Sequence, residues 1–278
     1  FLLKDGYRTT PIAEACKNGQ TDVMELYLNF GVTPELCVNS EEFLIHLAAR
    51  NSHAGVVDSL IKHGANPSAP NKNKQTPLDL AIEVGSLDVV KVLVAAGVHI
   101  DMDECPNVPI IEAAKRGHLD IVKFMVDNDA DMDAIDHLKH SAFYYACKTG
   151  QYRVAKYLLD NDCLLPKRVR EVTGLVEAAI LSKNPQVIRL VKKLKCKKPQ
   201  YHYDKQRWFE ALVSTGDIEL LEFYFPPKMK ECFEIAFWNT DHLKDLKKRG
   251  KMEMLKYVVD NGIFNTERGT VINQNTAK

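Results

Sequence analysis

The chain has 278 residues, a length that allows one or two ordinary domains. Apolar residues make up 45% and charged residues 27% of it, as in folded water-soluble proteins. Lysines plus arginines equal aspartates plus glutamates at 37 each, so net charge indicates no class of partner.

Targeting and redox signals are sparse. We find no apolar run of 18 residues or more and no signal-peptide pattern, so we expect no transmembrane helix. The chain lacks an initiating methionine, which suggests a piece of a longer protein. Seven cysteines without a CxxC pair favour a reduced, cytoplasmic setting, with the nucleus as the alternative location.

Taken in chain order, the sequence repeats itself. Positions equivalent to the first one, Thr10, follow one another at steps of 32 to 34 residues. They are Thr10, Phe43, Thr76, Val108, Ser141, Gly174, Arg207 and Asp241. Such even spacing predicts eight repeats, with starts near residues 5, 38, 71, 103, 136, 169, 202 and 236.

Each repeat has the pattern of two short helices, and the third repeat shows it best. Thr76 suits an N-cap, and Pro77 fits the first helical position, where its missing N–H costs nothing. Gly85 ends the first helix, Ser86 begins the second as its N-cap, and Gly97 ends it. Helices this short are unstable alone, so we expect each pair to pack against its neighbours.

These features together resemble the ankyrin-repeat family. The segment HLAARNSHAGVVDSLIKHGANPSA, residues 46–69, is similar to the family pattern on its own. The resemblance implies an all-α fold, an ankyrin-repeat solenoid of about eight helix-turn-helix units with β-turn fingers. We expect one such solenoid over residues 1–264 and a polar, disordered tail over residues 265–278. The resemblance also implies that His46 has a structural role and forms a hydrogen bond within its own turn.

Repeats six to eight depart from the pattern, so we expect the C-terminal repeats to be irregular. Gly174-Leu175, Arg207-Trp208 and Asp241-His242 stand where the family has Thr-Pro. The segment MKECFEIAFWN, residues 229–239, reads as a helix where a finger is due. It is either an inserted helix or the first helix of a differently framed repeat.

In ankyrin-repeat proteins the concave face, formed by fingers and first helices, usually holds a protein partner. The exposed ends of the first helices carry cations, which predicts a partner with acidic side chains: Lys17, Arg50, Lys115, Arg116 and Lys148. Four further residues would tune specificity: Lys72, Lys74, Glu83 and Leu138. The competing interpretation is that exposed helix positions favour Lys and Arg in any case.

The sequence contains no catalytic motif, and we predict no enzyme, no cofactor and no metal. The alternating Asp127, Asp129, Asp131 and Asp133 lack the glycine and glutamate of a calcium loop. The basic run Lys192–Lys198 contains no aromatic residue, which argues against a nucleic-acid binder. Oligomeric state is not predictable.

An alternative function is a regulatory or targeting segment of a larger enzyme or channel. The C-terminal repeats are unusually aromatic. Their side chains either fill a core of unusual geometry or dock another domain: Trp208, Phe209, Phe223, Tyr224, Phe225, Phe237 and Trp238.

Overall fold

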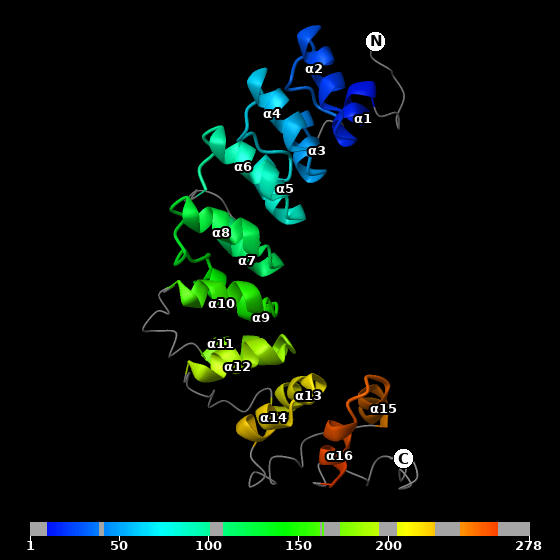
Figure 1. Ribbon diagram of the computed structural model, residues 1–278, viewed down its shortest axis with the longest axis vertical. Coiled ribbons are helices and arrows are strands. Elements are labelled where there is room, and N and C mark those ends of the chain that lie inside the picture. Colours follow the sequence, from blue (N-terminus) through cyan, green and yellow to red (C-terminus); the bar gives the residue numbers. More distant parts are fainter. Residues whose placement is uncertain are drawn as a thin grey trace. The chain divides into compact units, whose positions relative to one another are not determined.

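The computed structural model describes residues 10–38, 42–100, 108–161, 163, 173–194, 205–225 and 240–260. Within these ranges the chain forms sixteen α-helices and no strand beyond two isolated bridges (Figure 1). The helices come in eight pairs, one for each expected repeat, which confirms the all-α repeat fold. The segment 229–239 and the tail 265–278 lie outside the described residues.

The helix bounds follow the repeat spacing. The first five pairs are α1 (Pro11–Lys17) and α2 (Thr21–Asn29), α3 (Leu44–Arg50) and α4 (Ala54–Lys62), α5 (Pro77–Val84) and α6 (Leu87–Ala95), α7 (Pro109–Arg116) and α8 (Leu119–Asp127), α9 (Ala142–Lys148) and α10 (Tyr152–Asp160). The last three are α11 (Thr173–Leu181) and α12 (Pro185–Lys193), α13 (Lys205–Thr215) and α14 (Ile218–Tyr224), α15 (Thr240–Lys248) and α16 (Met252–Asp260).

The chain divides into two compact units. The first consists of Phe1–Ala146 with Arg153–Cys163, and the second of Cys147–Tyr152 with Leu164–Lys278. In the first unit, first helices pack on first helices and second helices on second helices of the adjacent repeat. In the second unit α11 packs on α12 and α13, and α15 packs on α16. A single solenoid over residues 1–264 stays a prediction.

The third repeat shows why these residues form these helices. The Thr76 hydroxyl accepts a hydrogen bond from the Asp79 backbone N–H, and the Asp79 carboxylate accepts one from the Thr76 N–H. This capping box satisfies two backbone donors that the first turn would otherwise leave without partners. Gly85 ends α5 in the left-handed conformation, with φ of 80°. Ser86 holds the N-cap position of α6, but its hydroxyl makes no capping hydrogen bond.

Small residues allow the helices to approach closely. Ala48 and Ala49 of α3 are fully buried, as are Ala113 and Ala114 of α7. Branched residues of the second helices fill the space beside them, including Val57, Val90 and Val122, all with no exposed surface. The buried sides of these helices are therefore mainly apolar, and the opposite sides of the first helices are left to carry charge.

The second unit packs its aromatic residues inside. Phe209 of α13 lies edge-on to Phe225 at 5.6 Å between ring centroids, and both are buried. Tyr224 is also buried and lies edge-on to Trp208. These rings fill a core, as one of the two sequence interpretations proposed. Phe223 stays 39% exposed, and Phe237 and Trp238 lie outside the described residues.

Candidate protein-interaction surface

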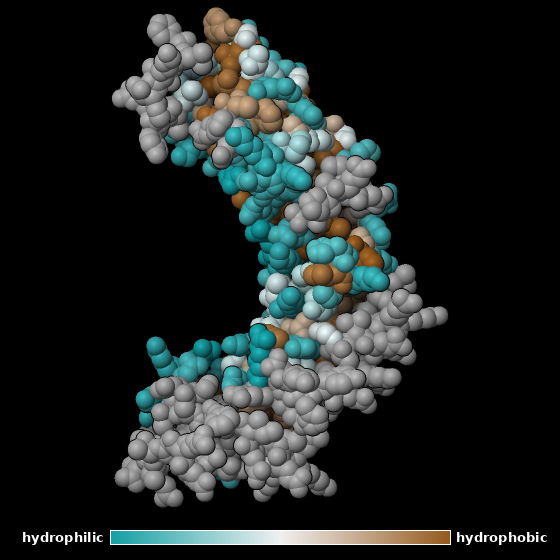
Figure 2. Space-filling model, turned by 180° about the vertical axis from the view of Figure 1, so that it is seen from behind, coloured by the Kyte–Doolittle hydropathy of each residue, from teal (hydrophilic) through white to brown (hydrophobic). Residues whose placement is uncertain are grey.

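The exposed ends of the first helices lie where the repeat spacing predicts. Lys17, Arg50 and Lys115 occupy equivalent positions at the ends of α1, α3 and α7, and all are exposed. Glu83 holds that position at the end of α5 and is partly exposed. Hydrophilic residues of the first unit gather on the side where the first helices lie (Figure 2). The fifth equivalent, Lys148, is exposed but belongs to the second unit.

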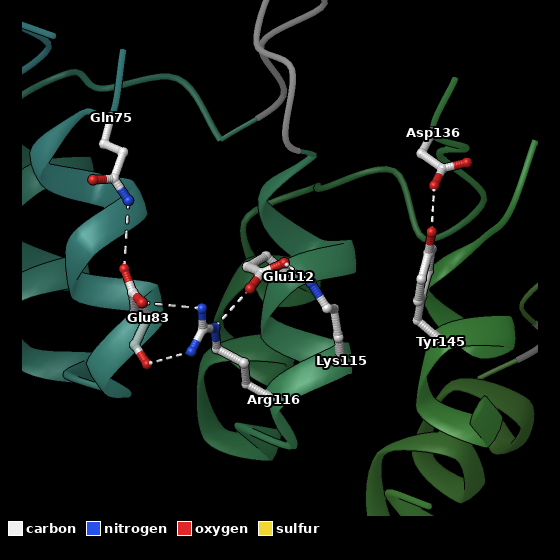
Figure 3. A network of polar contacts seen from close by, with 7 residues as sticks. All are labelled: Gln75, Glu83, Glu112, Lys115, Arg116, Asp136 and Tyr145. Atoms are coloured by element: carbon white, nitrogen blue, oxygen red, sulfur yellow. Dashed lines mark hydrogen bonds and ion pairs between the residues drawn. The ribbon is translucent and has the colours of Figure 1, made fainter. Parts of the chain in front are cut away.

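A polar network connects the third and fourth repeats across this side (Figure 3). The Arg116 guanidinium lies 3.2 Å from the Glu83 carboxylate and 2.6 Å from the Glu112 carboxylate. Glu112 also pairs with Lys115 at 3.1 Å. Glu83 in turn accepts a hydrogen bond of 3.4 Å from the Gln75 side chain. The network thus runs from the base of one finger to the end of the next repeat's first helix.

The charges of this network compensate one another. Burial raises the pKa of Glu112, but hydrogen bonds from Arg116 and Lys115 outweigh it and hold the pKa below its ordinary 4.5. Arg50 is likewise paired, with Glu42 at 2.8 Å. Three of the predicted cations therefore already have carboxylate partners. Glu83, which interrupts the row of cations in sequence, is the partner of one of them.

Three other predicted cations have no ion-pair partner among the described residues: Lys17, Lys72 and Lys74. All three are exposed, and the last two flank the tip of the finger Asn71–Gln75. Such side chains keep their full charge available to an approaching acidic group.

Two fingers share one turn geometry. In the finger Asn71–Gln75, the Asn71 side chain accepts from the backbone N–H groups of Asn73 and Gln75, both at 2.9 Å. In the finger Asp136–His140, the Asp136 carboxylate accepts from Leu138 and His140 at 2.9 and 2.8 Å. The fourth residue of each finger has a left-handed φ, near 60°. One side chain at the finger's first position therefore fixes the loop.

The Asp136 finger is further fixed from its own first helix. The Tyr145 hydroxyl of α9 donates to the Asp136 carboxylate at 2.7 Å (Figure 3). Burial raises the pKa of Asp136, but the hydrogen bonds from His140, Tyr145 and Leu138 outweigh it, and the pKa lies below its ordinary 3.8. This rigid loop leaves Leu138 57% exposed and Ile135 53% exposed.

His46 is structural, but its partner differs from the expected one. Its Nε2 donates to the carbonyl of Ala69, 2.8 Å away in the following loop rather than in its own turn. His46 has no exposed surface, and burial lowers its pKa below the ordinary 6.5. The neutral ring therefore connects two parts of the repeat.

No arrangement that suggests chemistry occurs in the parts of the chain that the structure describes. There is no group of three or more His, Cys, Asp or Glu that could hold a metal ion. Cys16 is buried, which raises its pKa to about 12 and suppresses the reactive thiolate. No helix in those parts is long and apolar enough to cross a membrane.

Comparison with known proteins identifies the repeat. The sequence family described as ankyrin repeats (3 copies) matches residues 12–104 and 100–169, which together cover more than half of the chain. The chain belongs to the ankyrin-repeat family. Ankyrin repeats generally mediate protein–protein interaction, and the fold is typically non-catalytic.

Two relatives of known sequence are much longer proteins than this chain. It is 29% identical over 156 residues to a transient receptor potential cation channel subfamily A member 1 homolog of Caenorhabditis elegans, covering 55% of this chain and 13% of the relative. It is 33% identical over 176 residues to the glycerophosphocholine phosphodiesterase gde1 of Schizosaccharomyces pombe, covering 61% and 15%. The human ASB11 ankyrin repeat domain superposes with a TM-score of 0.62 at 23% identity, covering 72% of this chain and 90% of that one.

Proposed function

We propose that this ankyrin-repeat chain is a non-catalytic interaction module whose first unit binds a partner protein with acidic side chains. The partner would lie against the ends of the first helices and the fingers. The observation that carries the proposal is that Lys17, Lys72 and Lys74 are exposed and have no carboxylate partner among the described residues, whereas the charges of the network compensate one another.

The two groups of charges have different roles in this proposal. Lys17, Lys72 and Lys74 attract the partner, because they are solvent-exposed and no carboxylate in the described part of the chain compensates their charges. Arg50, Lys115 and Arg116 are held by Glu42, Glu112 and Glu83, so they present oriented donors rather than net charge. Leu138, exposed on a fixed loop, supplies an apolar anchor. Lys148, at the equivalent repeat position, belongs to the second unit.

Rigidity supports this use of the surface. Packed helices and the side-chain bonds at Asn71 and Asp136 already fix the loops that the partner would contact. Binding then loses little conformational entropy in this chain, which leaves more of the contact energy for affinity.

The test compares two charge reversals of equal size. Lys72→Glu with Lys74→Glu reverses the finger, whereas Lys62→Glu with Lys91→Glu reverses two exposed lysines on second helices. Proteins captured from a lysate are quantified by mass spectrometry at low and high salt. We expect acidic partners to be lost from the finger variant and from wild type at high salt, and to be retained by the control. Equal capture by both variants would refute the proposed surface.

A second candidate function is a regulatory or targeting segment of a larger channel or enzyme. The observation that favours it is the similarity to a cation channel homolog and to a phosphodiesterase, of which the matched regions are small parts. The aromatic C-terminal repeats would dock another domain through the exposed ring of Phe223, since Phe209, Tyr224 and Phe225 are buried. Sequencing of the full-length transcript tests this: flanking sequence that encodes a catalytic or membrane-spanning domain is the expected result.

A further inference from the structure

One apolar face of the first repeat is uncovered where the same face of later repeats is buried. Val23 is the third residue of α2 and is 38% exposed. The third residues of α4, α6 and α8 are Val56, Val89 and Ile121, and none has any exposed surface. Side-chain size does not explain this contrast, because three of the four residues are valines.

The contacts of α4 show what covers this face inside the unit. Ser59 donates to the Glu25 carboxylate of α2 at 3.0 Å, and His63 Nε2 lies 3.3 Å from Asn29 Oδ1. A side chain at Gly55 would contact Thr21 of α2. The side of α4 that includes Val56, Ser59 and His63 therefore faces the second helix of the preceding repeat.

The equivalent side of α2 is more apolar and is exposed. Val23, Leu26 and Phe30 stand where α4 has Val56, Ser59 and His63, and they are 38%, 57% and 80% exposed. Their spacing places them on one side of the helix. Hydrophobic surface is visible at the end of the first unit where α2 lies (Figure 2).

We propose that Val23, Leu26 and Phe30 form a docking stripe for an amphipathic α-helix of a partner protein, with Lys or Arg flanking its apolar side. A helix is the fitting occupant because a helix covers the same face of α4. The flanking cations follow from Asp22, which adjoins Val23 and is exposed, and from the lack of any lysine or arginine in α2. Glu25 is bonded to Ser59 of α4 and so lies on the other side of the helix. This surface lies on a second helix and is separate from the first helices and fingers.

A second copy of this chain fits the stripe poorly. Two copies related by a twofold axis would bring the exposed Asp22 of one α2 near Asp22 of the other. Three exposed side chains on one helix are also far fewer than the roughly 20–30 residues a side of a standard stable interface. A partner helix of opposite charge avoids the repulsion.

The probe for this stripe is a synthetic amphipathic peptide of leucine and lysine, about four helical turns long. Its matched control replaces every lysine with glutamate. Binding to the whole chain is followed by calorimetry at physiological ionic strength. We expect saturable binding of the lysine peptide and at least about tenfold weaker binding of the glutamate peptide.

Substitutions test whether the lysine peptide binds at the docking stripe. Leu26→Ser with Phe30→Ser should weaken binding of the lysine peptide by about tenfold or more, as expected for apolar anchors. Val84→Ser is the control, because Val84 is a comparably exposed apolar residue on a first helix, at 42%. Circular dichroism should show that all variants fold, since the altered side chains are exposed.

Three results would overturn the proposal. Binding of the lysine peptide could fail to saturate. Val84→Ser could also weaken that binding as much as Leu26→Ser with Phe30→Ser does. Alternatively, sedimentation could show that wild type self-associates and that Phe30→Ser abolishes this, which would make the occupant a second copy.

Discussion

At the scale of single residues, side chains of one repeat rest on the glycine turn of the preceding one. A Cβ added at Gly85 would lie 2.5 Å from Cε1 of His118, and one at Gly19 would lie 2.5 Å from Nδ1 of His53. His53 also donates to the Lys17 carbonyl at 2.8 Å. These glycines therefore serve two purposes, the left-handed turn and the close approach of the next repeat.

Two glycines of the third repeat separate these purposes. Gly85 and Gly97 have φ of 80° and 86°, but a Cβ at Gly97 would meet nothing within 4 Å. Gly97→Ala should cost about 1–2 kcal/mol of unfolding free energy through its backbone conformation alone. Gly85→Ala should cost roughly 1–3 kcal/mol more, because the His118 ring must move. Urea unfolding followed by circular dichroism measures both.

The double variant Gly85→Ala with His118→Ala checks the cause of the extra loss. Removing the ring should recover part of it, giving a coupling energy of about 1 kcal/mol or more between the two positions. If Gly85→Ala and Gly97→Ala lowered the free energy of unfolding equally, the contact with His118 would contribute nothing to stability.

At the scale of elements, the Asp136 finger should depend on one acceptor. Asp136→Ala removes the partner of the Leu138 and His140 N–H groups and of the Tyr145 hydroxyl. We expect a loss of about 1–3 kcal/mol of unfolding free energy. Asp136→Asn should lose much less, because Asn71 holds the equivalent finger with the same two backbone bonds. Thermal unfolding of both variants measures the difference.

Acid should weaken the same finger in wild type. The folded-state pKa of Asp136 lies below its ordinary 3.8, so its stabilisation is present above that pH and is lost as pH falls below it. Asp136→Asn should lose this part of the acid sensitivity. If Asp136→Ala were as stable as wild type, the finger would be held by its backbone and not by this side chain.

The ends of a helix could be predicted from the sequence where neighbouring residues determine them. Thr76, Pro77 and Gly85 hold the predicted positions at the two ends of α5, because caps depend on residues adjacent in sequence. The partners of side chains that lie far apart in the sequence could not be predicted. Nothing in the spacing indicates that Arg116 pairs with Glu83, or that His46 bonds to Ala69, since each choice depends on which neighbour the packed helices bring near. The row of cations was visible in sequence, but its compensation by Glu42 and Glu112 was not.

At the scale of the whole molecule, we expect a destabilising substitution to affect mainly its own repeat and the adjacent ones, because each repeat packs on its neighbours. Ala81 is fully buried in α5, which packs on α3, α6 and α7. Ala81→Asp should cost about 3–5 kcal/mol, as expected for a buried charge without a partner. Both tryptophans of the chain, Trp208 and Trp238, belong to the second unit. We therefore expect the urea midpoint by circular dichroism to fall further than that by tryptophan fluorescence.

Val84→Asp is the matched control, because it adds the same charge to the same helix at a position that is 42% exposed. It should change either midpoint little. If Ala81→Asp shifted both signals by the same amount, the two units would unfold as one cooperative body, and local damage would spread through the chain.

The shared geometry of the fingers Asn71–Gln75 and Asp136–His140 has a consequence for how such a chain can change. In each finger the side chain of the first residue fixes the loop, while the third residue, Asn73 or Leu138, contributes to these bonds only its backbone N–H, which every residue except proline has. Mutations at the third position can therefore exchange a polar tip for an apolar one at little cost to folding. Selection can act on these tips for a new partner while the repeat beneath them is inherited unchanged.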